Sequence, residues 1–447
     1  MPIHTHTFDN GFRVIYEKPF NELKITSINV FCDIGSIHEP INCKGAAHFI
    51  EHMCFKGTEK IPTAKDIYVE YDKMGAAFNA STEKQHTNYT AKCMDQYSGN
   101  CIHILSDMLL NSRFQKREFV KEEKVVIEEN IRNSDIPYDI ATTILDSMLY
   151  SGSSYAEPVD DIKFHTKRFD YDSIVDIYQD FYQPSRMVLS IVTNVSFDEI
   201  LNQVKHSFFV KNVDRPTCRS IEKYTVNSSV PLQREIRYKF EIKPNLNTVQ
   251  LLLGFRVCNQ FHRDKYALNL LKAILSGSMG SRMSMILRED NGLTYSSSVY
   301  TTYFKHSGDF TIFAEMDKTK ILKNEIGNKA HLGVLPLLIQ MLNDLLAHGV
   351  TEDEVKLAKV NFRGKKMFSM ENNMNQSSHN GLELLRYSST RKMVSMNKIY
   401  DVFYKDITKK DIHEVARTYL KKENMNVCML GSSLPSLRMV KETVGSL

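Results

Sequence analysis

The sequence predicts an α+β fold built from two similar tandem domains, each a mainly antiparallel sheet packed with helices. Its 447 residues are long for one domain and enough for two of roughly 200 residues each. The order strand, Lys-Pro pair, second apolar strand occurs at residues 14–31 and again at 238–255. A helical stretch followed by an apolar strand ends each half, at 174–192 and 412–430. Because the same order recurs at similar offsets, we interpret the halves as copies of one domain.

The individual elements carry local signals. Segments 14–16 and 28–31 are rich in β-branched and aromatic residues, which is typical of strands. Gly349 follows an apolar helical pattern over residues 337–346, as a C-capping glycine does. Helix starts are predicted where an acidic residue follows a Ser or Thr by three positions: Thr63 with Asp66, Ser196 with Glu199, Thr351 with Glu354, and Thr408 with Asp411.

The boundary between the two halves is a stretch of linker composition. Residues 211–233 contain two prolines and a Ser-Ser pair, and they show no sustained hydrophobic period. We therefore predict an N-terminal domain over residues 1–211, a linker over 212–233 and a C-terminal domain over 234–447.

Composition excludes several classes of protein. Hydrophobic residues make up 42% of the chain and charged residues 25%, with a net charge of +4, which excludes a disordered chain. No apolar run approaches the ~20 residues of a membrane-spanning helix, so we expect no membrane insertion. No basic tract indicates nucleic-acid binding, so we expect no nucleic-acid partner. The eight cysteines are scattered and no targeting leader is seen, so the expected location is the reducing cytoplasm.

The sharpest motif is His48-Phe49-Ile50-Glu51-His52. On a helix, positions i and i+4 lie on one face, so both imidazoles can reach one metal ion. Glu51 would stand beside that ion without binding it, where it can act as a general base. This arrangement is the inverted form of the zinc-protease helix.

A catalytic zinc ion usually takes a third protein ligand from elsewhere in the chain. Glu122 and Glu129 lie seven residues apart in a segment of helical character, so both carboxylates would share one face. Glu128 is an equally available neighbour by spacing. Taken by itself, a helix rich in Glu and Lys is more often simply a solvated surface, so spacing leaves the third ligand open.

A structural Cys₂His₂ zinc site is a rival interpretation of the same region. Cys43 and Cys54 flank the two histidines. Cys54 lies two residues after His52, however, which is roughly 200° around a helix from it. Its thiol would point away from the metal, so this interpretation is disfavoured.

Four separated segments now carry a family resemblance: residues 45–58, 74–82, 122–129 and 287–295. Together and in this order they resemble the signature of the pitrilysin/insulinase family of zinc peptidases. The likeness is closest to the short branch that contains the mitochondrial processing peptidase beta subunit and its bacterial homologues. It spans residues from about 10 to 432, nearly the whole chain.

The resemblance implies a role for each matching residue. It makes His48, His52 and Glu129 the ligands of one Zn²⁺ per chain, Glu51 the general base, Glu122 a supporting carboxylate, Asn79 and Ala80 part of an edge strand that pairs with the substrate, and Arg288 and Tyr295 substrate contacts near the zinc. The gap from His52 to Glu129 is about one residue longer than the family pattern, so Glu128 remains an alternative ligand.

The resemblance also implies an assembly. Each family chain forms half of a clamshell chamber, so a partner is expected, either a second copy or a related chain. The second domain has no metal helix, because the apolar segment 271–275 occupies the matching position. One chain should therefore hold one zinc ion.

The function that this resemblance implies is a zinc-dependent endopeptidase of the 3.4.24 class, acting on short or unfolded peptides. The alternative is a non-catalytic interaction or substrate-binding subunit of a complex, because such members occur in the family. Residues 153–158 and 277–281 depart from the common pattern and leave the substrate preference open.

Overall fold

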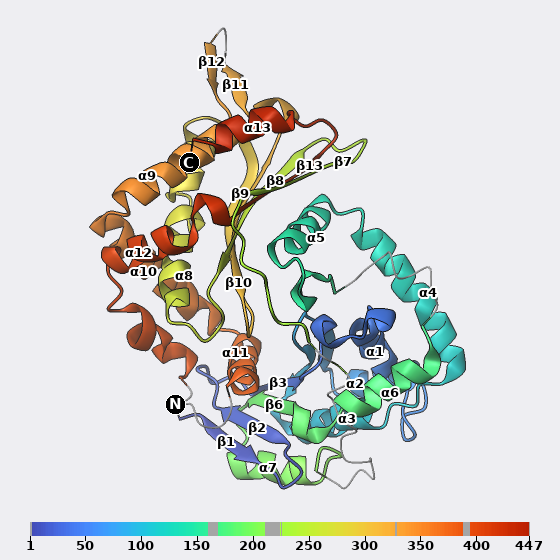
Figure 1. The fold of residues 1–447 in the computed structure, drawn as a ribbon. Helices are drawn as coiled ribbons and strands as arrows, with labels where there is room; N and C mark the ends of the chain where they lie inside the picture. Colours follow the sequence, from blue (N-terminus) through green and yellow to red (C-terminus); the bar gives the residue numbers. More distant parts are fainter. Residues whose placement is uncertain are drawn as a thin grey trace. The chain divides into compact units, whose positions relative to one another are not determined.

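The computed structural model describes residues 2–159, 169–210, 224, 226–326, 329–387 and 394–446 (Figure 1). The chain forms two compact units, each drawn from three stretches. The first unit comprises residues 1–132, 157–227 and 366–399, and the second comprises residues 133–156, 228–365 and 400–447. The predicted α+β class with two similar domains is confirmed. The predicted boundaries at 211 and 234 stay a prediction, because most of the linker segment lies outside the described residues.

The first unit contains a six-stranded sheet in the order β1-β2-β6-β3-β5-β4. Strands β2 and β6 are parallel and the other neighbours are antiparallel. The strands are β1 (His4–Thr7), β2 (Arg13–Glu17), β3 (Ile25–Cys32), β4 (Ala77–Thr82), β5 (Thr87–Met94) and β6 (Met187–Val192). Every residue of β6 is buried, as expected for a continuously apolar strand at the centre of a sheet.

The second unit repeats this topology. Its five-stranded sheet has the order β7-β13-β8-β10-β9, which matches β2-β6-β3-β5-β4 strand for strand. The parallel pair recurs as β7 and β13. The strands are β7 (Arg237–Ile242), β8 (Val249–Val257), β9 (Thr294–Tyr303), β10 (Gly308–Met316) and β13 (Met425–Gly431), and β11 (Lys323–Ile326) forms a separate hairpin with β12 (Lys329–Leu332). The shared order supports the interpretation of the two halves as copies of one domain.

Helices pack against both sheets. In the first unit they are α1 (Ala46–Cys54), α2 (Ala64–Lys73), α3 (Ser98–Leu110), α4 (Lys116–Asn133), α6 (Tyr171–Phe181), α7 (Phe197–Lys205) and α11 (Asn373–Arg386). In the second they are α5 (Pro137–Leu149), α8 (Asp264–Ser276), α9 (Val334–His348), α10 (Glu352–Ser369), α12 (Lys409–Tyr419) and α13 (Leu437–Val444). Helix α4 extends into the second unit by Asn133 alone, and α10 extends into the first unit by residues 366–369.

One helix from each half of the chain packs on the sheet of the other half. Helix α5 contacts β8 and β13 in the second unit, although it precedes the predicted linker. Helix α11 contacts β3 and β6 in the first unit, although it lies late in the chain (Figure 1). Glycines permit both close approaches, because Gly254 of β8 faces Leu145 and Gly381 of α11 faces Phe31.

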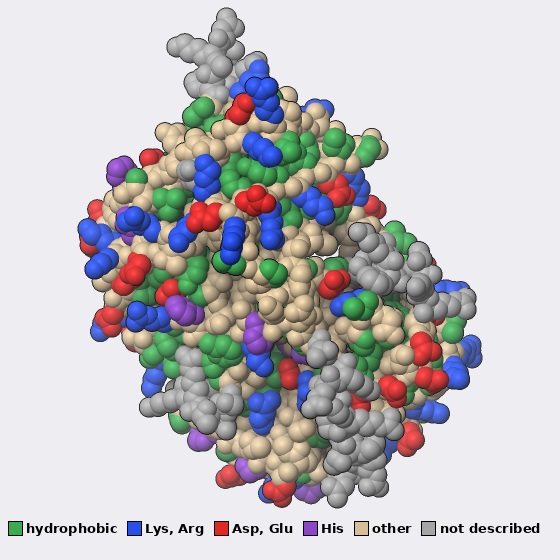
Figure 2. Space-filling model, in the orientation of Figure 1, with side chains coloured by type: hydrophobic (Ala, Val, Ile, Leu, Met, Phe, Trp, Pro, Cys, Tyr) green, Lys and Arg blue, Asp and Glu red, His purple; other side chains and the backbone are tan. Residues whose placement is uncertain are grey.

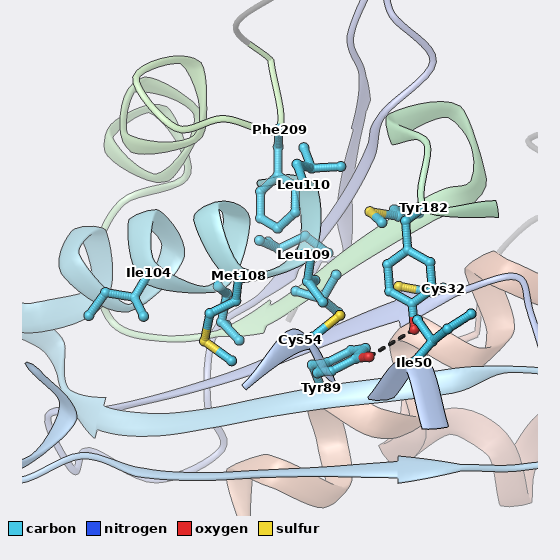
Figure 3. Close-up of a cluster of buried hydrophobic side chains, with 14 of the residues drawn as sticks. Cys32, Ile50, Cys54, Tyr89, Ile104, Met108, Leu109, Leu110, Tyr182 and Phe209 are labelled. Carbon is cyan, nitrogen blue, oxygen red and sulfur yellow. Dashed lines mark hydrogen bonds between the residues drawn. The ribbon is translucent and has the colours of Figure 1, made fainter. Parts of the chain in front are cut away.

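The core of the first unit lies between its sheet and its helices (Figure 3). Ile50 and Cys54 of α1 pack there with Met108 and Leu109 of α3. Within it, the hydroxyls of Tyr89 and Tyr182 form a hydrogen bond of 2.8 Å, which satisfies two buried polar groups. The described cysteines are free thiols, and all of them except Cys258 are buried.

The predicted helix starts are found in the structure. Thr63 and Ser196 accept hydrogen bonds from the backbone N–H groups of Asp66 and Glu199. The carboxylates of Glu354 and Asp411 also accept hydrogen bonds from the backbone N–H groups of the capping residues Thr351 and Thr408, which completes two capping boxes. Gly349 ends α9 with φ of 75°.

The surface carries both signs of charge. On the face drawn in Figure 2, Lys and Arg side chains are interspersed with Asp and Glu. Among the described helices, none alone is long and apolar enough to cross a membrane. Helices α9 and α10 satisfy length and composition only as a pair bent by 110°.

Candidate metal centre

Helix α1 is held at both ends by features of its own sequence. The Glu39 carboxylate accepts hydrogen bonds of 2.8 Å from the backbone N–H groups of Gly45 and Ala47, which satisfies donors of the first turn. After the helix, Gly57 has φ of 118°, and a Cβ there would lie 2.2 Å from the Pro62 carbonyl oxygen. This turn therefore requires glycine. Because the apolar face of α1 is buried, its histidines face a cavity on the other side.

The structure brings together three of the predicted ligands. The Nε2 atoms of His48 and His52 lie 3.1 Å apart, and Nε2 of His52 lies 3.5 Å from Oε2 of Glu129. The three ligand atoms all fall within 4.8 Å of one another, and each side chain is half-buried. Two ligand atoms about 2.05 Å from a tetrahedral zinc ion would be about 3.3 Å apart. The donor set and its spacing therefore fit zinc.

Helix α4 supplies Glu129, and its rotation about its own axis is set by packing. Phe119 of α4 meets Phe49 of α1 edge-on, with ring centroids 4.7 Å apart. This contact turns Glu129 toward the histidines, whereas Glu128 is exposed and outside the cluster. Cys54 lies in the core on the opposite side of α1, as the helical angle predicts.

The Glu122 carboxylate contacts both His52, a candidate metal ligand, and the Lys56 ammonium group. Its Oε1 lies 2.8 Å from Nδ1 of His52, and its Oε2 lies 2.6 Å from Nζ of Lys56. Burial acts to raise the pKa of Glu122, but the hydrogen bonds from His52 and Lys56 outweigh it and hold the pKa below its ordinary value. A His52 that donates from Nδ1 presents the lone pair of Nε2, which is the orientation a metal requires. Sequence reasoning missed Lys56, although it is two turns from His48 on the same segment.

Glu51 is held from the opposite side of the cavity. It is 8% exposed, and its Oε2 accepts a hydrogen bond of 2.5 Å from the hydroxyl of Thr82. Thr82 is the last residue of β4. This residue was also missed at the level of sequence, although it lies in one of the four segments that carry the family resemblance.

Strand β4 forms one wall of the cavity and the edge of the sheet. Asn79 and Ala80 lie on it, paired with Thr90 and Tyr89 of β5 on one side. The cavity has a volume of about 490 Å³. Its lining combines the polar centre with apolar side chains: His48, Glu51, His52, Glu122, Glu129, Asn79, Phe55, Tyr68, Phe78 and Val125, among others. An open strand edge beside a cavity is a site where an extended peptide can add to the sheet.

Two predicted substrate contacts belong to the second unit. Arg288 lies in a short π-helical segment, Ser284–Glu289, and Tyr295 lies near the start of β9. Tyr295 is 66% exposed, so its phenol is available to a ligand. Their contact with a substrate stays a prediction.

Comparisons with known proteins indicate the family and the fold. The family model described as Insulinase (Peptidase family M16) matches residues 14–161, and the one described as Peptidase M16 inactive domain matches residues 168–362. An uncharacterised zinc protease of Bacillus subtilis is 30% identical over 379 residues, covering 85% of this chain and 87% of the relative. The mitochondrial-processing peptidase subunit beta of Dictyostelium discoideum is 27% identical, covering 69% and 65%. A solved protease from Helicobacter pylori has a TM-score of 0.84 at 19% identity, covering 96% and 99%, and so shares the fold.

Proposed function

The chain belongs to the insulinase family, peptidase family M16, and on that premise we propose that it is a zinc-dependent endopeptidase acting on short or unfolded peptides. One observation carries the proposal. The ligand atoms of His48, His52 and Glu129 lie within 4.8 Å of one another, in a cavity that also holds the Glu51 carboxylate. A metal site of three protein ligands with a neighbouring base is the arrangement of catalytic rather than structural zinc.

Zinc at this position would supply Lewis acidity, which polarises a peptide carbonyl and lowers the pKa of water. The remaining steps fall to the side chains of this chain. Glu51 accepts the proton of the attacking water and passes it to the leaving amine. Glu122 and Lys56 keep the His52 ring oriented, because Glu122 accepts a hydrogen bond from each.

Strand β4 would hold the substrate. Backbone groups of Asn79 and Ala80 can pair with an extended peptide, so peptides that lack fixed structure would be favoured as substrates. Arg288 and Tyr295 are proposed to contact the substrate or its developing oxyanion.

A partner chain is part of the proposal. The Dictyostelium relative is a subunit by name, which supports an assembly of two such chains, either identical or related. In that case Arg288 and Tyr295 of one chain would serve the metal centre of the other.

The experiment pairs zinc content with cleavage of a mixed peptide library, after the mass in solution is measured. Wild type should hold about one zinc per chain and cut peptides. Glu51→Gln should retain zinc and lose cleavage, whereas His48→Ala should lose both. Glu128→Gln is the matched control for Glu129→Gln, and only the second should lose zinc.

Cleavage at wild-type rate by Glu51→Gln would show that the general-base assignment is wrong. Absence of both zinc and cleavage in wild type would favour the non-catalytic subunit instead. Zinc without cleavage in a monomer would be followed by mixing with a related chain.

A further inference from the structure

We propose that Thr82 is a positioning residue for Glu51, and that it links the substrate-binding edge of β4 to the general base. The proposal rests on the proposed peptidase function and adds a residue to that site. Its basis is a hydrogen bond between the end of the edge strand and the carboxylate that lies beside the two metal-binding histidines.

The Thr82 hydroxyl donates to one oxygen of the Glu51 side chain, and the distance from Oγ1 to Oε2 is 2.5 Å. The two residues are 31 positions apart in the sequence, so the bond is a tertiary contact between β4 and α1. Glu51 is 8% exposed, so little water competes for this oxygen.

Thr82 is itself held by the turn between β4 and β5. It pairs with Thr87 across the hairpin, and the backbone N–H of Glu83 donates to the His86 carbonyl oxygen at 2.8 Å. The Thr87 hydroxyl donates to the Ile34 carbonyl oxygen at 2.9 Å, which ties the hairpin to the rest of the unit. The donor therefore comes from a braced position, whereas a glutamate side chain by itself has several rotamers.

The same strand would bind the substrate at Asn79 and Ala80, which lie three and two residues before Thr82. A peptide that pairs with this edge orders the strand, and the order reaches Glu51 through the threonine hydroxyl. Strand β4 would therefore both bind the peptide and align the Glu51 carboxylate. Loss of the hydroxyl should remove one of the contacts that orient Glu51, while the backbone groups that bind the peptide remain.

Thr82→Ser provides the matched control, because it keeps a hydroxyl at the same place on the strand. Thr82→Val removes the hydroxyl while keeping the shape of the side chain, and Thr82→Ser restores the hydroxyl.

The kinetic test measures kcat, KM and zinc content with a single peptide taken from the library. We expect Thr82→Val to lower kcat about 10-fold or more, since general-base catalysis contributes about 10²–10⁴-fold. Its KM should stay within about twofold of wild type and its zinc content should be unchanged. Thr82→Ser should keep kcat near the wild-type value. A kcat for Thr82→Val within twofold of wild type, or an equal loss in Thr82→Ser, would overturn the proposal.

A second test needs neither zinc nor activity. In metal-free protein, Thr82→Val should lower the urea midpoint of unfolding, and this shift should vanish when Glu51→Ala is already present. An equal shift in both backgrounds would show that the hydroxyl does not act through Glu51, and would overturn the proposal. Failure of wild type to cleave any peptide, both alone and mixed with a related chain, would instead refute the peptidase function, and the midpoints would still decide whether the bond exists.

Discussion

Adding one methyl group at Gly381 should destabilise the first unit. Gly381 lies in α11, where the helix packs on β3 and β6. An added Cβ would lie 2.3 Å from Cε2 of Phe31, 2.6 Å from its Cδ2 and 2.9 Å from Cβ of Ser190. Phe31 is 1% exposed and Ser190 is fully buried, so neither can move aside into solvent. The Gly381→Ala variant must therefore shift the helix or strain the ring.

The magnitude follows from two opposing effects. Replacing glycine by alanine inside a helix is favourable by about 1 kcal/mol, because it removes backbone entropy from the unfolded chain. Overpacking a dense core costs about 1–3 kcal/mol and occasionally more, and contacts this short belong at the upper end. The free energy of unfolding should fall by a net ~2 kcal/mol.

The matched control is Gly364→Ala in α10, where no atom lies within 4 Å of the added Cβ. This variant should be stabilised by about 0.5–1 kcal/mol. Urea unfolding followed by far-UV circular dichroism compares both variants with wild type. Equal midpoints for the two variants would refute the packing argument. Conversely, Phe31→Leu should cost less in the Gly381→Ala background than in wild type, because it relieves the clash.

Three further predictions concern buried polar groups and the metal. Burial, with Asp146 nearby, raises the pKa of Asp309 to about 6 from its ordinary value of 3.8. The contribution of this carboxyl group to the free energy of unfolding therefore falls as pH rises from about 4 to 6. Asp309→Asn should therefore stabilise the protein at pH 7 more than at pH 4, by up to roughly 3 kcal/mol, and equal urea midpoint shifts at both pH values would contradict this. Thr58→Val should lower stability by about 1–3 kcal/mol, because the buried Asp107 carboxylate loses a donor at 2.5 Å; an unchanged midpoint would argue against that bond. A chelator should lower the melting temperature of zinc-loaded wild type but leave His48→Ala unaffected, and a shift in both proteins would point to zinc bound elsewhere.

Features that depend on residues within one or two helical turns could be predicted from the sequence. The spacing of His48 and His52 places both imidazoles on one face wherever that segment is helical. The capping threonines and Gly349 act on backbone groups three or four residues away, and the structure contains each cap. The repeated strand order could also be predicted, because each copy of the domain has its own local pattern of strands and helices.

Contacts between segments distant in the chain were decided only by the tertiary structure. Spacing left Glu128 and Glu129 open, since both lie on α4, and the packing of Phe119 against Phe49 decides which carboxylate faces the histidines. The bond from Thr82 to Glu51 spans 31 residues. No local period encodes such contacts, because the distance between two elements depends on how their buried faces pack.

The exchange of α5 and α11 between the halves has the same cause. Helix α5 is apolar on one face, whereas the buried face of α11 is mainly polar. Asn373 and Ser377 of α11 donate hydrogen bonds to the backbone carbonyls of Ile25 and Ser190. Neither helix sequence states which sheet must cover the buried face. Which sheet covers it is decided by shape, for example by Gly381 against Phe31 in the first unit and Gly254 against Leu145 in the second. Local chemistry therefore determines the helix that carries His48 and His52, whereas close packing between distant segments determines which carboxylate joins them and which residues contact Glu51.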